Sequence, residues 1–476
     1  MKTVENLLEK AILRIPKNKK VGLLFSGGID SLALAFYLKK LNYNFTCYTV
    51  GVEDSKDIEV AKKLASELQL KHKVKVFSVK EIEKTLKKVV PILRTTSPVD
   101  VSVGLTTYLA SKFAKEKIVI SGLGSDEIFG GYSRHKDSKD LNEDLRLGLD
   151  RAYNGDLVRD VTIAKSLGKE IFTPFLDKDL VSYALTIPSS KKINSKGVNK
   201  LILRELLTSN GIKSEFAMRL KKAAQYGSGF DKVISKLAGK NPKEKYLRSF
   251  FNVCSLYSSG KDSTYSLQLI KDLGYNVNCL VTIKSKNLDS YMYHTPNVNL
   301  VKLQSKSLGL PLITVNTSGQ KEDELKDLKR ALVKAKKKFK ISGVVTGALF
   351  SEYQASRIGK ICTSLSLECF NPLWHKDQSS YMKELLANKY EIIISSIAAD
   401  GLDEYWLGRK LDSKMLDDLD KLNNKIGLNV AFEGGEAESL VVNCPLFKKK
   451  IEIIKAEKKM SSEFVGKYLI KKAKLI

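Results

Sequence analysis

Two short segments of the chain, FSGGIDS at residues 25–31 and YSSGKDS at residues 257–263, combine small residues with an aspartate. In each segment an apolar stretch ends in glycine and serine and a helical pattern begins, so backbone N–H groups and the positive end of a helix converge on one point. A phosphate group fits that point, because glycine lets the backbone approach the anion and serine hydroxyls donate hydrogen bonds to it. Asp30 and Asp262 can hold a Mg²⁺ ion that neutralises the phosphates. The candidate phosphate-binding residues are Ser26, Gly27, Gly28, Asp30, Ser31, Ser258, Ser259, Gly260, Lys261, Asp262 and Ser263.

The spacing within the two loops narrows the chemistry. Neither has the GxxxxGK[ST] pattern, so transfer of a terminal phosphoryl group in the P-loop manner is not supported. Both resemble the SGGxDS loop of the ATP pyrophosphatases, the PP-loop, and this resemblance implies attack on the α-phosphorus of ATP with release of pyrophosphate. The alternative is that the two segments are ordinary turns or helix caps. Ser259 stands where the first loop has Gly27, and a serine there is expected to disfavour a backbone conformation with positive φ.

The loops belong to a longer internal repeat. Residues 23–47 align without gaps on residues 255–279, and in both copies a strand, a glycine-rich turn, a helix and a second strand follow one another. Further apolar segments alternate with helical ones at 58–70 and 103–115, which is typical of a parallel sheet. The expected strands are 45–50, 74–79, 117–121, 278–283, 312–315, 343–346, 391–399 and 440–447. We therefore expect an α/β protein with two PP-loop parallel-sheet domains, the second followed by a smaller α/β subdomain.

The boundary between the two domains is expected within residues 236–248, where glycine, proline and charged residues cluster. This divides the chain into residues 1–245 and 246–476. Within the second domain we expect a nucleotide fold at about 250–355 and a substrate-recognition subdomain at about 356–476.

The composition is that of a folded and strongly basic protein. Hydrophobic residues make up 43% of the 476 residues, and the formal net charge is +28. Lysines are spread along almost every helix-like stretch, which favours a solvated basic surface over a nucleic-acid site, although binding to nucleic acid stays open. No apolar segment is long enough to cross a membrane and no signal peptide is visible, so we expect a cytoplasmic location without a membrane partner. The six scattered cysteines lack a CxxC pair and are expected to be reduced thiols, without a structural metal.

The first half carries further segments in order, SGLGSDEIFGGYSRH from Ser121, TPFLDKDLV, KLILREL and RLKKAAQYGSG. Together with the first loop they resemble the synthetase domain of asparagine synthetases over residues 15–235. The resemblance implies that Lys221 is a catalytic residue that stabilises the adenylation transition state, and that Asp126 joins Asp30 at the magnesium ion. It also implies that ATP and its pyrophosphate are supported by the GSDE loop, which consists of Gly124, Ser125, Asp126 and Glu127.

Two features depart from that family. Residue 2 is Lys2, where the family has the cysteine that generates ammonia, and no glutaminase domain precedes the loop, so ammonia must come from elsewhere. Leu123 stands where asparagine synthetases have a glutamate tied to the chemistry after adenylation, and a leucine cannot move a proton. The first domain is therefore expected to bind ATP with its amide-forming step lost or changed. Asparagine-type amidation and a role as scaffold or regulatory ATP sensor both stay open.

The second half carries seven segments, YSSGKDS, YMYHTPN, GALFSEYQASRI, PLWHKDQ, GLDEYWLG, EGGEAES and CPLF. In this order they resemble the diphthine–ammonia ligase family from residue 251 to 454. The resemblance implies ATP-dependent amidation of diphthine, a modified histidine on elongation factor 2, through an acyl-adenylate. Elongation factor 2 bearing diphthine and ammonium are then the partners, and ATP and Mg²⁺ are the cofactors.

The resemblance also assigns residues around the second loop, with Asp262 as a catalytic metal ligand. If the fourth strands of the two copies superpose at Gly122 and Gly347, Glu352 falls where Glu127 does and is expected to handle magnesium or ammonia. The alternative for Glu352 is a helix cap. Diphthine carries a quaternary ammonium group, which aromatic faces and carboxylates hold best. The expected substrate-binding residues are His294, Tyr353, Gln354, Arg357, Trp374, Glu433, Glu436 and Glu438, and Trp406 is a further aromatic candidate. For His294 and the tryptophans, the alternative is a structural role.

A second class of PP-loop enzymes modifies tRNA, and the basic charge keeps this alternative open. The absence of paired cysteines argues against tRNA thiolation. ATP turnover that is stimulated by tRNA, and not by the elongation factor, would favour this class.

Overall fold

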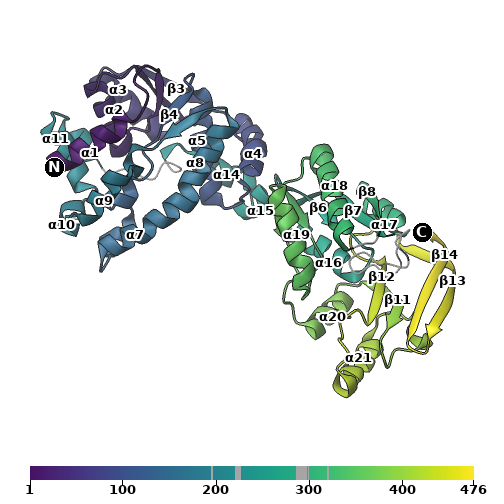
Figure 1. Cartoon of the computed structure of the whole chain (residues 1–476). Helices are drawn as coiled ribbons and strands as arrows, with labels where there is room; N and C mark the ends of the chain where they lie inside the picture. Colours follow the sequence, from purple (N-terminus) through teal and green to yellow (C-terminus); the bar gives the residue numbers. More distant parts are fainter. Residues whose placement is uncertain (195–196, 220–226, 286–296, 298–299, 319–320) are drawn as a thin grey trace. The chain divides into compact units, whose positions relative to one another are not determined.

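The computed structural model describes residues 1–194, 197–219, 227–285, 297, 300–318 and 321–476. The chain divides into two compact units, Met1–Leu247 and Arg248–Ile476, called unit 1 and unit 2 below. Each unit contains one five-stranded sheet, and unit 2 adds a four-stranded sheet (Figure 1). The expected α/β class with two parallel-sheet folds is therefore confirmed.

The sheet of unit 1 has the strand order β3-β2-β1-β4-β5, and all its neighbouring strands are parallel. The strands are β1 (Val21–Leu24), β2 (Phe45–Gly51), β3 (His72–Val76), β4 (Ile118–Ile120) and β5 (Glu170–Phe172). The helices are α1 (Lys2–Leu13), α2 (Ile29–Lys40), α3 (Lys56–Glu67), α4 (Val79–Leu93), α5 (Pro98–Phe113), α6 (Ser125–Phe129), α7 (Leu141–Arg151), α8 (Leu157–Ser166), α9 (Lys178–Thr186), α10 (Ser189–Lys192), α11 (Leu201–Ser209), α12 (Ser214–Ala217), α14 (Phe230–Ala238) and, at the end of the unit, α15 (Lys243–Arg248).

Helix α2 fixes the first loop in place. It begins directly after Gly28, which occupies the N-cap position, and Asp30 lies in its first turn, where the helix dipole favours a negative charge. Eight of its residues are buried, from Ile29 to Leu38, because the helix packs into the main core of unit 1. The first loop therefore connects a buried strand to a buried helix, and both ends of its backbone are held in place.

Two parts of the unit 1 sheet differ from the expectation. The strand expected at 74–79 ends at Val76, since Ser78 starts helix α4 with a capping box. Ser78 Oγ accepts a hydrogen bond from Glu81 N at 3.3 Å, and the Glu81 carboxylate accepts one from Ser78 N at 2.9 Å. Strand β5 was not expected, because it is only partly buried and lacks the continuous apolar run of the equally short β4.

The parallel sheet of unit 2 has the order β10-β9-β6-β7-β8, which read backwards is the order found in unit 1. Its strands are β6 (Asn252–Leu256), β7 (Asn276–Ser285), β8 (Leu312–Thr317), β9 (Gly343–Val345) and β10 (Glu368–Phe370). Its helices are α16 (Lys261–Asp272), α17 (Val301–Leu308), α18 (Lys321–Phe339) and α19 (Glu352–Ser364). Strand β10 lies beyond residue 355, so the nucleotide fold extends past the expected boundary.

The C-terminal subdomain of unit 2 is a four-stranded antiparallel sheet with two helices. Its strand order is β12-β11-β14-β13. The elements are α20 (Gln378–Ala387), β11 (Glu391–Ala398), α21 (Ser413–Ile426), β12 (Ala437–Asn443), β13 (Ile451–Ser462) and β14 (Val465–Leu475). The apolar strand β11 and both helices contribute to one buried core, which explains why β11 reads as an almost continuous hydrophobic run.

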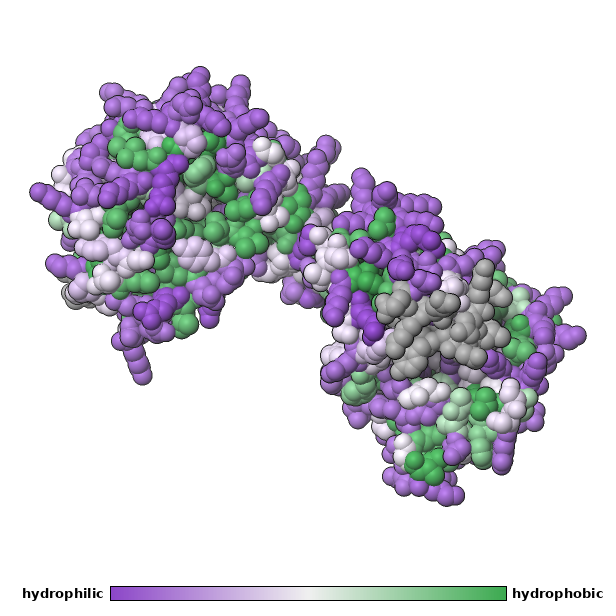
Figure 2. All heavy atoms as spheres, in the orientation of Figure 1, coloured by the Kyte–Doolittle hydropathy of each residue, from purple (hydrophilic) through white to green (hydrophobic). Residues whose placement is uncertain are grey.

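The face of each unit drawn in Figure 2 is largely hydrophilic, with smaller hydrophobic areas between. Among the described residues, no helix combines the length and the apolar character needed to span a membrane. All six cysteines are free thiols.

Candidate active sites

In unit 1 the candidate site lies where the strand order reverses. β1 stands between β2 and β4, and in open parallel sheets ligands bind in the crevice outside the carboxyl ends of the strands at such a point. The loop after β1 and the loop after β4 meet there. A Cβ atom on Gly122 would lie 2.9 Å from the Cβ atom of Asp30, so a glycine is needed for this close approach.

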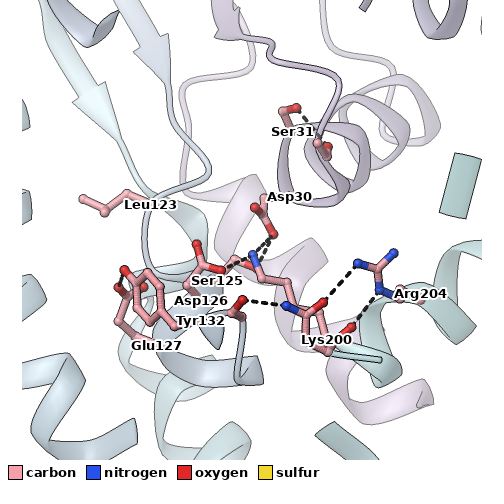
Figure 3. A network of polar contacts seen from close by, with 12 residues as sticks. Asp30, Ser31, Leu123, Ser125, Asp126, Glu127, Tyr132, Lys200 and Arg204 are labelled. Carbon is pink, nitrogen blue, oxygen red and sulfur yellow. Dashed lines mark hydrogen bonds and ion pairs between the residues drawn. The ribbon is translucent and has the colours of Figure 1, made fainter. Parts of the chain in front are cut away.

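Two side chains converge on Asp30 and Asp126, the expected metal ligands (Figure 3). Ser125 Oγ donates a hydrogen bond to Asp30 Oδ1 at 2.6 Å, and Lys200 Nζ lies 2.6 Å from the same oxygen. Lys200 Nζ also lies 2.7 Å from Asp126 Oδ1. The Lys200 side chain is 5% exposed, whereas Asp30 is 24% and Asp126 is 36% exposed. The structure thus brings both carboxylates together around a buried ammonium group.

Glu127 lies beside this cluster and is almost completely buried. The Tyr132 hydroxyl donates a hydrogen bond to Glu127 Oε1. Burial, reinforced by the charge of Asp126, raises the pKa of Glu127 to about 7. Near neutral pH this side chain therefore exists in both protonation states, so it can donate as well as accept a hydrogen bond.

A cavity of about 1400 Å³ opens beside these residues. It exceeds the volume of about 300–1,000 Å³ that is usual for one small ligand, so it has room for a nucleotide and a second substrate. Leu123 lines this cavity and packs against the core, which puts an apolar side chain in the wall. Five expected residues line the cavity, namely Ser26, Asp30, Ser31, Asp126 and Glu127. Gly27, Gly28, Gly124 and Ser125 belong to the two loops, and Lys221 lies outside the described residues.

Asp30 and Asp126 suit a magnesium ion that is held jointly with phosphate. Mg²⁺ in proteins commonly takes one or two carboxylates and fills its other positions with phosphate oxygens and water. Within the described ranges of the chain, no group of three or more His, Cys, Asp or Glu side chains is arranged to hold a metal by itself. The donor set therefore fits an ion that enters together with a nucleotide.

Unit 2 repeats this arrangement with different partners. Asp262 stands in the first turn of α16, as Asp30 does in α2. Lys261 Nζ contacts both carboxylate oxygens of Asp262, at 2.8 and 2.9 Å, and the Tyr381 hydroxyl donates to Asp262 Oδ1 at 2.8 Å. Lys261 and Tyr381 are both buried, so the charged pair is shielded from water on that side.

Ser259 adopts the backbone conformation that the first loop reserves for a glycine. Its φ is 75°, and that of Gly27 is 69°, so Ser259 has a positive φ at this place although serine disfavours it. The carbonyl oxygen of Ser259 accepts hydrogen bonds from Val441 N and from Gln304 Nε2, both at 3.1 Å. A positive φ costs a residue other than glycine about 1–2 kcal/mol, and these two bonds offset that cost.

The C-terminal subdomain contributes directly to the second loop. Ser439 Oγ on β12 accepts a hydrogen bond from Lys261 N at 3.1 Å, two residues before Val441 contacts the loop carbonyl. Within the loop, Ser258 N and Ser258 Oγ both donate to Ser263 Oγ, at 3.3 and 3.2 Å. The EGGEAES segment therefore forms part of the wall of the phosphate loop.

Glu433 is a partly buried carboxylate close to the second loop. Its Oε2 accepts a hydrogen bond from Phe350 N at 3.2 Å, which ties the turn before β12 to the segment before α19. Burial, and next to it the charge of Asp262, raises the pKa of Glu433 to about 7. Glu433 thus resembles Glu127 in its pKa, although it comes from a different part of the fold.

Glu352 has a different environment from Glu127. It is exposed in the first turn of α19, and Ser351 provides the cap of this helix by accepting a hydrogen bond from Gln354 N. The expected superposition of the fourth strands, with Gly122 on Gly347, agrees with the strand register. Leu23 pairs with Ile120 in unit 1, and the corresponding Ser255 pairs with Val345 in unit 2. The proposed role of Glu352 stays a prediction.

The remaining expected substrate residues of unit 2 fall into three groups. The Arg357 guanidinium covers the Tyr353 ring at 3.7 Å from its centroid, and the half-buried Trp374 contacts the edge of His375. Glu436 accepts hydrogen bonds from Gly434 N at 2.9 Å and Asn429 N at 3.2 Å, so it shapes the turn that carries Glu433. Gln354 and Glu438 are half-buried, Trp406 packs in the subdomain core, and His294 lies outside the described residues.

Lys200, Tyr381 and Gln304 are among the site residues that the sequence did not reveal. Lys200 opens the KLILREL segment, which signalled a family resemblance but no role for the lysine. Tyr381 and Gln304 lie on helices far along the chain from the loop that they contact. Such contacts leave no local pattern, so a single sequence offered no signal for the last two.

Protein-family models cover both units. The model described as asparagine synthase matches residues 3–146 and 136–256. The models described as the N-terminal and C-terminal domains of diphthamide synthase match residues 251–369 and 377–476.

Individual relatives follow the same division. The diphthine–ammonia ligases of Bos taurus and Rattus norvegicus are 34% and 35% identical over 224 residues, which is 43% of this chain and 84% of each relative. A putative glutamine-hydrolysing asparagine synthetase of Methanocaldococcus jannaschii is 34% identical over 278 residues, covering 50% of this chain and 51% of that protein. The chain thus spans about half the length of the latter relative. Both resemblances are confirmed: unit 1 belongs to the asparagine synthase family and unit 2 to the diphthamide synthase family, two families of ATP-dependent ligases.

Proposed function

We propose that unit 2 is a diphthine–ammonia ligase, which activates the carboxylate of diphthine on elongation factor 2 with ATP and then forms the amide with ammonium. One observation carries the proposal: the phosphate loop and the C-terminal subdomain form one polar cluster. Asp262 accepts a hydrogen bond from Tyr381, and Lys261 N donates to Ser439. A subdomain in direct contact with the loop can present a protein-borne carboxylate to bound ATP. The identity to diphthine–ammonia ligases over most of their length supports the same assignment.

In the proposed reaction a carboxylate oxygen attacks the α-phosphorus of ATP, the bond to pyrophosphate breaks, and an acyl-adenylate forms. Ammonia then attacks the carbonyl carbon and AMP leaves. Lys261 and the loop N–H groups stabilise the charge that develops on the phosphates, at about 3 kcal/mol for a well-placed donor. Asp262 would hold Mg²⁺ jointly with the phosphates, and the ion would neutralise the leaving pyrophosphate. Glu433, with its pKa near 7, is suited to take the proton that ammonium must lose.

For the quaternary ammonium group of diphthine we assign Trp374 and Glu438, an aromatic and acidic pair that suits a cation without N–H donors, because Arg357 already covers the Tyr353 ring. Glu438→Gln is expected to weaken binding of the diphthine-bearing factor more than binding of ATP. Titration of both ligands by calorimetry would decide this, and equal losses for both would count against the assignment.

The test of the ligase is a reaction of the full chain with ATP, ammonium and diphthine-bearing elongation factor 2, a cytoplasmic substrate. Mass spectrometry of the factor reports diphthamide, and chromatography reports AMP. Asp262→Ala is expected to abolish both products, while the matched variant Asp30→Ala keeps them, because Asp30 belongs to the other loop. Loss of diphthamide in Asp30→Ala alone would overturn the assignment to unit 2.

We infer a second activity, ATP binding with carboxylate activation, for unit 1. The observation that favours it is the cluster of Asp30, Asp126 and Lys200 beside a cavity with room for two substrates. The experiment uses Asp262→Ala, in which unit 2 is silent, with ATP, aspartate and ammonium. AMP release without asparagine would show that the step after adenylation is missing, and Leu123→Glu is then expected to restore asparagine formation. No AMP release with aspartate would rule out an asparagine-type acceptor.

A further inference from the structure

Each unit places one buried lysine against the aspartate of its loop, but the two lysines come from different places in the chain. In unit 2 it is Lys261, directly before Asp262. The corresponding position in unit 1 is Ile29, a buried apolar residue. There Lys200 supplies the ammonium group, 170 residues along the chain from Asp30. A cation at the aspartate is thus retained in both copies although its source has changed.

The position of Lys200 is held by a dedicated set of contacts. Lys200 occupies the N-cap position of α11 with a left-handed backbone conformation, φ 52°. The preceding residue, Asn199, is held by hydrogen bonds to two other segments. Asn199 Nδ2 donates to Gly131 O at 2.5 Å, and Arg204 donates to Asn199 O at 2.7 Å and to Asn199 Oδ1 at 3.2 Å. A Cβ atom on Gly131 would overlap the side chains of Asp126 and Lys200, so glycine leaves room for the ion pair.

Lys200 faces the cavity as well as its two carboxylate partners. Lys200, Asp30 and Asp126 all line the 1400 Å³ cavity, and both carboxylates remain partly accessible from it. A buried ion pair that serves structure alone contributes little stability, because the cost of removing its charges from water offsets their attraction. Here the ammonium group occupies the space between two carboxylates that suit a metal ion. Without this positive charge, the two carboxylates would repel an incoming triphosphate.

We propose that Lys200 is the triphosphate-binding cation of unit 1 and the counterpart of Lys261. In the unliganded site it bridges Asp30 and Asp126, and when ATP and Mg²⁺ enter together its ammonium group moves from the carboxylates to the phosphates. The inference rests on the proposed nucleotide site of unit 1. It follows that Mg²⁺ alone binds poorly, because the lysine already occupies the space between its ligands.

Hydrogen exchange followed by mass spectrometry tests this in the full-length wild-type chain. Peptides over residues 26–32 report the first loop, peptides over 197–203 report the Lys200 segment, and peptides over 258–264 report the second loop. ATP with Mg²⁺ is expected to protect the first loop and to change exchange at 197–203, while Mg²⁺ alone changes neither. Protection of the loop with no change at 197–203 would show that Lys200 does not respond to the nucleotide, and the inference would fail. If ATP with Mg²⁺ protects nothing in unit 1, the proposed nucleotide site fails as well.

A pair of variants gives the second measurement. Lys200→Met is expected to raise the apparent Kd for ATP with Mg²⁺ at the first loop at least tenfold, and to let Mg²⁺ alone protect that loop. The second loop, in the same molecule, keeps its Kd. Lys192→Met is the matched control, because Lys192 is also fully buried but bonds Asn142 instead of a carboxylate. An unchanged Kd in Lys200→Met, or an equal rise in Lys192→Met, would overturn the inference. Should Lys200→Met fail to fold, the wild-type titration still decides.

Discussion

Replacing Glu433 with glutamine is expected to stabilise unit 2, and to do so more strongly as the pH rises. Burial and the charge of Asp262 raise the pKa of Glu433 to about 7, from a reference value of 4.5. The folded state therefore resists ionisation of this group more than the unfolded chain does. As a result the wild-type protein loses stability as the pH rises from 4.5 to 7, and loses no more above that range. Glutamine cannot ionise, yet it keeps an oxygen for the Phe350 N–H group.

The two pKa values set the size of the effect. Relative to low pH, the wild-type protein has accumulated a cost of about 2.5 pKa units at pH 8.5, or about 3.4 kcal/mol at 1.36 kcal/mol per unit. The same linkage gives about 1.4 kcal/mol at pH 5.5 and about 0.4 kcal/mol at pH 4.5. Because the side chain is only partly buried, solvent screening reduces these values, and they are upper bounds.

Native-state hydrogen exchange measures this difference within one unit. The slowest amides of β6 report global unfolding of unit 2, and those of β1 in unit 1 serve as the internal control. Glu433→Gln is expected to gain stability in β6 that grows from pH 4.5 to 8.5, with β1 unchanged. A gain that did not vary with pH, or a loss at pH 8.5, would refute the raised pKa. The variant is also expected to form diphthamide more slowly, because it lacks the proposed proton acceptor.

Four further substitutions have defined outcomes. Ser259→Gly should stabilise unit 2 by about 1 kcal/mol, because glycine adopts a positive φ freely. Gly27→Ser, the opposite replacement at the matching position of the first loop, should destabilise unit 1. Hydrogen exchange of the β6 amides measures the first effect, and that of the β1 amides measures the second. Tyr381→Phe removes the hydrogen bond to Asp262 without opening a cavity. A hydrogen bond to a charged group is worth about 1.5 kcal/mol, so AMP formation should be about tenfold slower. An unchanged rate would show that Tyr381 does not position Asp262. Gly131→Ala should abolish protection of the first loop by ATP with Mg²⁺, because the added methyl group overlaps the ion pair.

Much of the fold could be predicted because its signals are local. Alternating apolar and helical segments indicated parallel sheets, and the repeat of 23–47 at 255–279 indicated that the fold occurs twice. The errors also have local causes. Strands β5 and β10 are only partly buried and lack the apolar run of the equally short β4 and β9, and the apolar segment 74–79 concealed the capping box at Ser78 that ends β3 and starts α4.

The sites were predictable only as far as their residues lie in the loops. Asp30 and Asp262 follow directly from the repeat, since a strand, a turn and a helix position them within a few residues. Lys200 and Tyr381 reach those aspartates from 170 and 119 residues away, so only the folded chain reveals them. Ser259 shows the same limit, because tertiary hydrogen bonds to its carbonyl group overcome the local preference of serine for negative φ.

The duplicated loop explains why the two sites can differ so much. Strand order and the helix after the first strand fix one aspartate in each unit, and everything around that aspartate comes from elsewhere in the chain. In unit 1 the cation is Lys200 and the neighbouring acid is Asp126, from the loop after β4. In unit 2 the cation lies within the loop, and the neighbouring acid with a raised pKa is Glu433, from the C-terminal subdomain. We expect the acceptor to contact these neighbouring groups and not the loop that both units share, so the two units are expected to have the same ATP chemistry while they select different carboxylates.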